Sequence, residues 1–216
     1  MRRESSTVIA LVGRVSGRQL AALAESGNVS VVRPAESGPP GAAVTGRDAG
    51  SGTRAGATSP AWEPGAIGMR EAARRRATYV VVPSDPLAGV AAAWREMWDV
   101  AAGPATAAAF EEQAADTLAA WRGKQFELPD YYLVVAPPQH VPTGPDFYLG
   151  PLRAARPRRV AVATSPDSAA GANGPTMTAS LLDTLRSLEH GPWWPPLDEL
   201  VEATRRFYAG GLAETQ

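Results

Sequence analysis

The chain has 216 residues, of which 44% are hydrophobic, and a formal net charge of -1 from 21 basic and 22 acidic residues. This length and composition suit one globular core, so we expect a single α/β domain over residues 1–216. The near balance of charge argues against nucleic acid or anionic lipid as a partner. The absence of cysteine excludes disulfides, thiolate nucleophiles and cysteine-based metal sites.

The sequence shows no signal peptide and no membrane segment. The apolar run that begins at Val8 is shorter than the roughly 7 to 15 residues of a signal-peptide core. No stretch approaches the roughly 20 apolar residues of a membrane helix. We therefore expect a soluble, cytoplasmic protein.

The first elements form a β-α-β unit. Residues 7–13 and 29–34 are short β-branched runs, and helical spacing of apolar residues lies between them. Ser16 and Gln19 make a capping box, and Gly27 supplies the end of the helix.

A Gly/Pro/Ala-rich stretch at about 35–68 follows. It carries too few aliphatic residues to offset the entropy of ordering, so we expect a disordered insertion. Only Trp62 and Ile67, near its end, are suited to dock on the body of the protein. Residues 69–77 then suggest a short, arginine-rich helix.

Residues 79–82 predict another strand and lead into a helix, for which Asp85 is the N-cap and Pro86 the first residue. Residues 104–121 predict a second helix, and together the two form an added α-hairpin. Trp94, Trp98 and Trp121 are expected in the core.

The run of apolar residues at 132–136 is typical of an interior parallel strand buried on both faces, and two prolines end it. A brief helical crossover, a fifth strand and two further helices complete the chain. Strict alternation of strands and helices predicts a doubly wound, Rossmann-like α/β fold. We expect a five-stranded parallel sheet of flavodoxin-type order, 2-1-3-4-5, with the α-hairpin and a C-terminal helix.

Nucleotide-binding motifs are missing. Gly13 and Gly17 have the wrong spacing for G-x-G-x-x-G, and no P-loop occurs. A two-component receiver is disfavoured because no carboxylate follows the first strand.

In open α/β sheets, ligands bind outside the carboxyl ends of the strands. Seven residues at these ends are candidates to bind an anionic small molecule: Arg14, Ser16, Ser84, Asp85, Gln139, His140 and Ser165. Ser16 and Asp85 are also explained as helix caps, which lowers their value as evidence for a ligand.

His140 and Asp85 are the candidates for a catalytic group. The imidazole of His140 is the stronger of the two, because an imidazole titrates near neutrality. A triad of Ser84, His140 and Asp167 has no G-x-S-x-G elbow to support it. The two histidines and scattered carboxylates show no ligand spacing, so we expect neither a metal nor a cofactor.

Trp193 and Trp194 stand between prolines in the stretch GPWWPP. The restricted backbone predicts that at least one ring stays exposed, as an anchor for a protein partner or a homo-oligomer. The sequence therefore favours a non-catalytic protein-interaction or accessory module. The alternative is a small enzyme or sensor that binds a nucleotide-like or phosphorylated ligand at the carboxyl ends of the strands.

Overall fold

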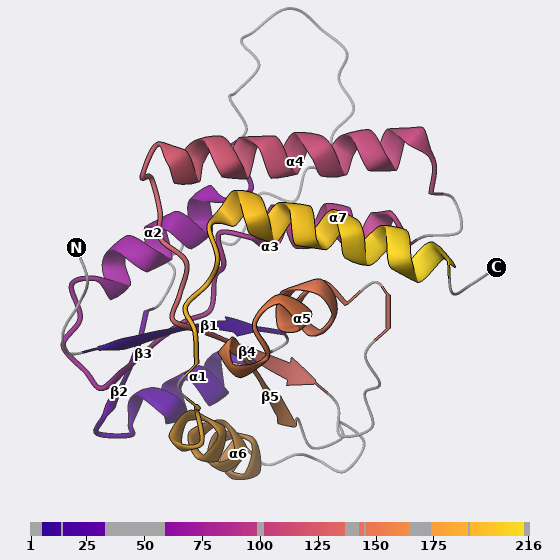
Figure 1. The fold of residues 1–216 in the computed structure, drawn as a ribbon. Coiled ribbons are helices and arrows are strands. Elements are labelled where there is room, and N and C mark those ends of the chain that lie inside the picture. Colours follow the sequence, from indigo (N-terminus) through magenta and orange to yellow (C-terminus); the bar gives the residue numbers. More distant parts are fainter. Residues whose placement is uncertain are drawn as a thin grey trace, which may run out of the picture.

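The computed structural model describes residues 6–13, 15–32, 59–98, 102–136, 143–144, 146–164, 174–189 and 191–213. Its strands are β1 (Thr7–Val12), β2 (Val29–Val31), β3 (Tyr79–Val82), β4 (Tyr131–Ala136) and β5 (Val160–Thr164). They form one parallel sheet in the order β2-β3-β1-β4-β5 (Figure 1). The predicted α/β doubly wound class, with five parallel strands, is confirmed.

The order of the strands differs from the expected 2-1-3-4-5, because β1 and β3 exchange places. β1 is the central strand and pairs with both β3 and β4. Its residues from Val8 to Leu11 are all buried, as suits an interior position. β2 has three residues and lies at the edge, where a short strand exposes little unpaired backbone.

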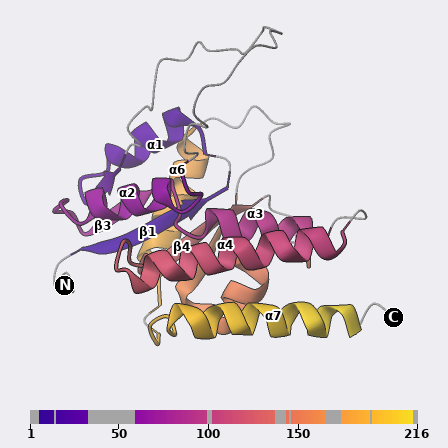
Figure 2. The same cartoon turned by 90° about the horizontal axis from the view of Figure 1, so that it is seen from above.

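Helices cover both faces of the sheet (Figure 1). One face carries α1 (Gly17–Ala24) and α6 (Gly174–Arg186). The other carries α2 (Glu63–Ala72), α3 (Ala88–Glu96), α4 (Pro104–Arg122) and α7 (Leu197–Ala213). Three short helical stretches on that side lead from β4 to β5: η1 (Tyr148–Leu152), α5 (Arg153–Ala155) and η2 (Pro157–Arg159). Figure 2 shows α3, α4 and α7 side by side.

The apolar strands contribute side chains to two hydrophobic cores, one on each face of the sheet. In β4, Tyr131 and Leu133 pack with α1 and α6, whereas Tyr132 and Val134 pack with the opposite layer. This division follows from the alternation of side chains along a strand. It explains why the sequence of β4 shows no polar residue on either face.

The predicted insertion extends too far toward the C-terminus. Residues 33–58 lie outside the described part of the chain, but the residues that follow them build α2, which begins at Glu63. Ala66 and Met69 are buried in the core. A side chain at Gly65 would overlap the backbone of Asp85 and Pro86, so glycine permits this close approach. The apolar face of α2 is made of small residues, which is why composition alone suggested disorder.

Two predicted helix starts have different outcomes. Ser16 and Gln19 form the expected capping box of α1, with Ser16 N donating to Gln19 Oε1 at 2.7 Å. Asp85 is not the N-cap of the next helix, since α3 begins at Ala88 and its cap position is Leu87. The predicted α-hairpin is present, and the rings of Trp94 and Phe110 meet between α3 and α4 at 6.0 Å. Among the described residues, no helix combines the length and apolar character needed to cross a membrane.

Candidate functional site

Four of the predicted ligand residues, Arg14, Gln139, His140 and Ser165, lie outside the described residues. Ser16 is engaged in its capping box, where Gln19 N donates to Ser16 Oγ at 3.3 Å. Ser84 Oγ donates to the carbonyl oxygen of Pro64 at 3.3 Å, which ties β3 to the start of α2. Both hydroxyls therefore have structural partners.

Asp85 is the centre of a buried polar cluster. Its Oδ1 accepts hydrogen bonds from the hydroxyl of Tyr132 at 2.8 Å and from the backbone N–H of Leu87 at 3.0 Å. Its Oδ2 accepts one from the hydroxyl of Tyr148 at 2.7 Å. Asp85 is 6% exposed and Tyr132 is fully buried. The carboxylate is thus surrounded by three donors, away from solvent.

Three elements bring this cluster together. Asp85 follows β3, Tyr132 lies in β4, and β1 runs between these strands. Ala10 of β1 pairs with Val82 on one side and with Tyr132 on the other. Its methyl side chain leaves room above the central strand for the tyrosine to reach Asp85. Tyr148 comes from η1, the stretch that follows β4.

Burial dominates the titration of the cluster. Desolvation raises the pKa of Asp85, and the hydrogen bonds from Leu87, Tyr148 and Tyr132 oppose that shift. Burial, with the nearby Asp85 charge, raises the pKa of both tyrosines well above its usual value. The hydroxyls therefore stay protonated and donate at neutral pH. The arrangement joins the sheet to α3 and η1.

The GPWWPP stretch divides its two rings between solvent and core. Trp193 is 47% exposed, which confirms the prediction that at least one ring remains at the surface. Trp194 turns inward: its Nε1 donates to the carbonyl of Pro129 at 2.9 Å. Its ring also meets Tyr132 edge-to-face at 5.5 Å. Trp193 is thus the more exposed member of the pair.

Arg159 holds the exposed Trp193 ring in place, and we call this arrangement the Trp193 clamp. Its guanidinium lies 4.0 Å from the centre of the Trp193 ring and 4.7 Å from that of Tyr131. It also donates to the carbonyls of Gly191 at 2.6 Å and Pro192 at 3.2 Å. Arg159 is only 3% exposed. These contacts satisfy the buried charge through aromatic faces and carbonyl dipoles.

Sequence reasoning missed Arg159. An arginine run before a strand is typical of a solvated surface, and Arg156 and Arg158 beside it are indeed more exposed. Arg156 assists the clamp, since its Nε donates to the carbonyl of Trp193 at 2.7 Å. The excess of aromatic residues was the available signal, but it does not say which arginine they contact.

The GPWWPP stretch lies beside the amino-terminal ends of the strands, whereas a ligand was expected at their carboxyl ends. Pro129, Tyr131 and Arg159 precede or begin β4 and β5, so they mark the amino-terminal ends of these strands. Ligands of open α/β sheets bind at the carboxyl ends. Trp193 therefore lies away from the usual small-molecule crevice.

Within the described ranges, no three histidine, cysteine or acidic side chains gather as metal ligands would. Comparisons of the chain with models of known families, with curated proteins and with solved structures found no match. The function therefore has to be argued from the geometry of the chain itself.

Proposed function

We propose that this chain is a non-catalytic protein-interaction module built on a doubly wound α/β fold, with its contact surface around Trp193. The observation that carries the proposal is the clamp: a 47% exposed indole is stacked on a buried arginine. An aromatic ring held in one orientation loses little entropy when a partner covers it. Exposed tryptophans of this kind are common anchors of protein interfaces.

The polar side chains at the carboxyl ends of the strands support the same proposal. Ser16, Ser84 and Asp85 each have an internal partner that accounts for the position of the side chain. A binding site for an anion needs donors that point toward the ligand. In the described residues at the carboxyl ends of the strands, these polar groups are hydrogen-bonded within the protein.

The test substitutes Trp193→Ala and compares it with Ile67→Ala, because both side chains are 47% exposed and Ile67 lies on the distant helix α2. Partners are captured with the tagged chain, each is purified, and its binary affinity is measured; self-association is followed by sedimentation. We expect Trp193→Ala to weaken the complex by on the order of 2 kcal/mol and Ile67→Ala to leave it unchanged. Equal affinity of both variants would refute the proposal.

A second candidate function is the binding of a small phosphorylated ligand at the carboxyl edge of the sheet. The observation in its favour is Asp85, a buried carboxyl with a shifted pKa, since such groups cluster at functional sites. A thermal-shift screen of nucleotides and sugar phosphates separates the two functions, because a ligand that binds only the folded state raises its stability. A reproducible shift that Arg14→Ala abolishes would favour the second candidate.

A further inference from the structure

Beside the Trp193 clamp, three shallow pockets adjoin one another between the 153–159 segment and α7. The first has a volume of about 480 Å³ and reaches from Gly144 to Phe207. The second, of about 400 Å³, contains Arg156 and Arg206, and the third, of about 240 Å³, contains Pro157 and Pro192. The third pocket shares Arg156 with the second and Pro157 with the first, so the three lie next to one another, and we call this surface the groove.

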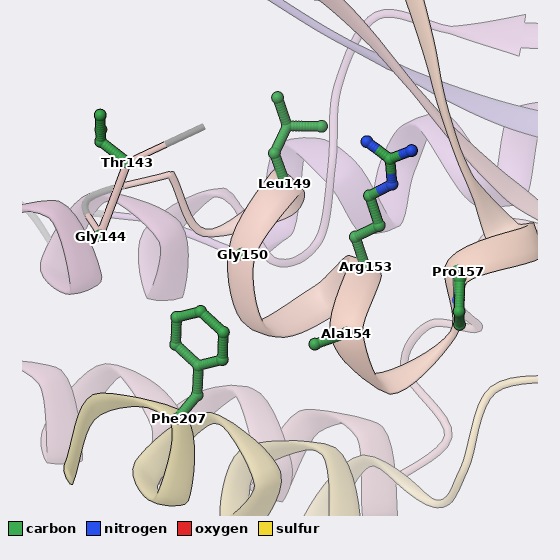
Figure 3. Close-up of a pocket in the computed structure, with 8 residues that line it drawn as sticks. All are labelled: Thr143, Gly144, Leu149, Gly150, Arg153, Ala154, Pro157 and Phe207. Atoms are coloured by element: carbon green, nitrogen blue, oxygen red, sulfur yellow. The ribbon is translucent and has the colours of Figure 1, made fainter. Parts of the chain in front are cut away.

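The two ends of this groove carry exposed aromatic rings. Phe207 of α7 is 37% exposed and rises toward Gly150 and Ala154 in the first pocket (Figure 3). The Trp193 ring is stacked on Arg159, which lines the third pocket, so it lies beside the other end.

The groove carries more basic than acidic side chains, in a chain whose formal net charge is -1. Its lining includes five arginines and two glutamates: Arg153, Arg156, Arg158, Arg159 and Arg206 with Glu199 and Glu202. Arg159 is only 3% exposed and Arg158 is paired with Glu189, so the charge open to a ligand comes mainly from the other three arginines. Within the described residues, Arg153 and Arg206 have neither a hydrogen bond nor an ion pair. Figure 3 shows that the Arg153 side chain extends away from the Phe207 ring, so its charge is not covered by α7.

We infer that this groove binds an extended, acidic segment of a partner protein, with apolar side chains of that segment against Trp193 and Phe207. The inference rests on the proposed interaction function and names the chemistry of its partner. Arg153 and Arg206, unpaired within the described residues, line different pockets, which favours a chain with several carboxylates over a single small anion. Complementary charge across such a surface speeds association and selects the partner.

Two other occupants fit the charges less well. A nucleic acid carries phosphates at every step, and these would meet Glu199 and Glu202 in the middle pocket. A second copy of this chain, paired through the same groove in a two-fold dimer, would set a mainly basic surface against itself. A peptide can set a neutral or basic residue opposite the glutamates and carboxylates opposite the arginines.

The experiment selects from a library of random linear peptides on the immobilised full-length chain, then measures the affinities of the enriched peptides by fluorescence polarisation. The test variant carries Arg153→Glu with Arg206→Glu. Its matched control carries Arg18→Glu with Arg76→Glu, two exposed arginines outside the groove. Thermal melts confirm that each variant is folded.

We expect acidic peptides to be enriched, the groove variant to bind them at least about tenfold more weakly, and the control to stay within about twofold. Affinity should also fall as salt is raised. Absence of enrichment, enrichment without acidic residues, or equal binding by the groove variant would overturn the inference.

A third variant, Trp193→Ala, tests the proposed function separately. Peptides that need Trp193 but not the arginines would support the interaction module and reject the acidic partner. Peptides that need the arginines but not Trp193 would support the acidic partner and reject Trp193 as the anchor of the interaction module.

Discussion

The Asp85 cluster and the Trp193 clamp lie at different places on the same sheet and use polar groups in different ways. Around Asp85, every polar group is paired with another inside the protein. Around Trp193, the charge of Arg159 and the backbone carbonyls are paired as well, but the Trp193 ring stays 47% exposed. The difference separates a buried polar cluster that joins elements from a partly exposed aromatic surface.

The two regions share one residue. Tyr132 donates to Asp85 through its hydroxyl and packs against Trp194 through its ring. Trp194 is the neighbour of the exposed Trp193, so the position of the surface ring depends on the packing beneath it. Substitutions in each region show how far that dependence reaches.

The largest effect is expected from Asp85→Ala. The substitution leaves the buried hydroxyls of Tyr132 and Tyr148 without their acceptor, and we expect a loss of about 3 to 5 kcal/mol in the free energy of unfolding. Urea denaturation followed by circular dichroism measures the loss. Ser84→Ala is the control, since its single 3.3 Å hydrogen bond is worth about 1 kcal/mol. Equal effects of the two substitutions would show that the cluster contributes little.

Arg159→Ala is expected to cost about 2 to 4 kcal/mol, because it removes a buried guanidinium with two carbonyl acceptors and two aromatic contacts. The fluorescence of Trp193 should also change as its ring is released. Arg158→Ala tests the neighbouring position, where an exposed ion pair with Glu189 is worth less than about 1 kcal/mol. Unchanged stability in Arg159→Ala would mean that the clamp does not order the 191–196 segment.

The paired tryptophans give the next largest contrast. Trp194→Ala removes the hydrogen bond to Pro129 and the contact with Tyr132, and we expect it to lower the free energy of unfolding by about 2 to 3 kcal/mol. Trp193→Ala should cost less than about 1 kcal/mol, since nearly half of its surface is already in solvent. Thermal and urea denaturation of both variants measure the difference. If Trp193→Ala instead unfolds the chain, Trp193 is a core residue and the proposed interface loses its anchor.

The smallest effect is a pH dependence that belongs to Asp85. Burial raises its pKa in the folded state above the ordinary value of 3.8, so the folded protein binds this proton more tightly than the unfolded chain does. The stabilisation is complete below the unfolded value and is lost as pH rises through the folded value. Each unit of pKa difference corresponds to about 1.4 kcal/mol.

The measurement compares wild type with Asp85→Asn, in which the other carboxylates contribute equally. The stability of wild type relative to the variant should fall as pH rises above 3.8 and then level off above the folded-state pKa of Asp85. A relative stability that rises with pH would show that the three hydrogen bonds outweigh burial and lower the pKa of Asp85.

Local patterns in the sequence predicted many of the elements of this fold. Alternation of strands and helices predicted the α/β class, the run at 132–136 predicted a strand buried on both faces, and Ser16 with Gln19 predicted the start of α1. The prolines of GPWWPP predicted an exposed ring, found at Trp193. Each of these inferences depends on residues a few positions apart, where periodicity, capping and backbone restriction act.

Only the tertiary structure decided which distant segments meet. It placed β1 between β3 and β4, added α2 to the core through small residues, and took Asp85 from a helix cap into a cluster with Tyr132 and Tyr148. It also buried Arg159 between two aromatic rings. The sequence by itself determined the local conformations, because neighbouring residues set them; the partners of these side chains lie tens of residues away, and only the packing of the sheet and its two helical layers brings them together.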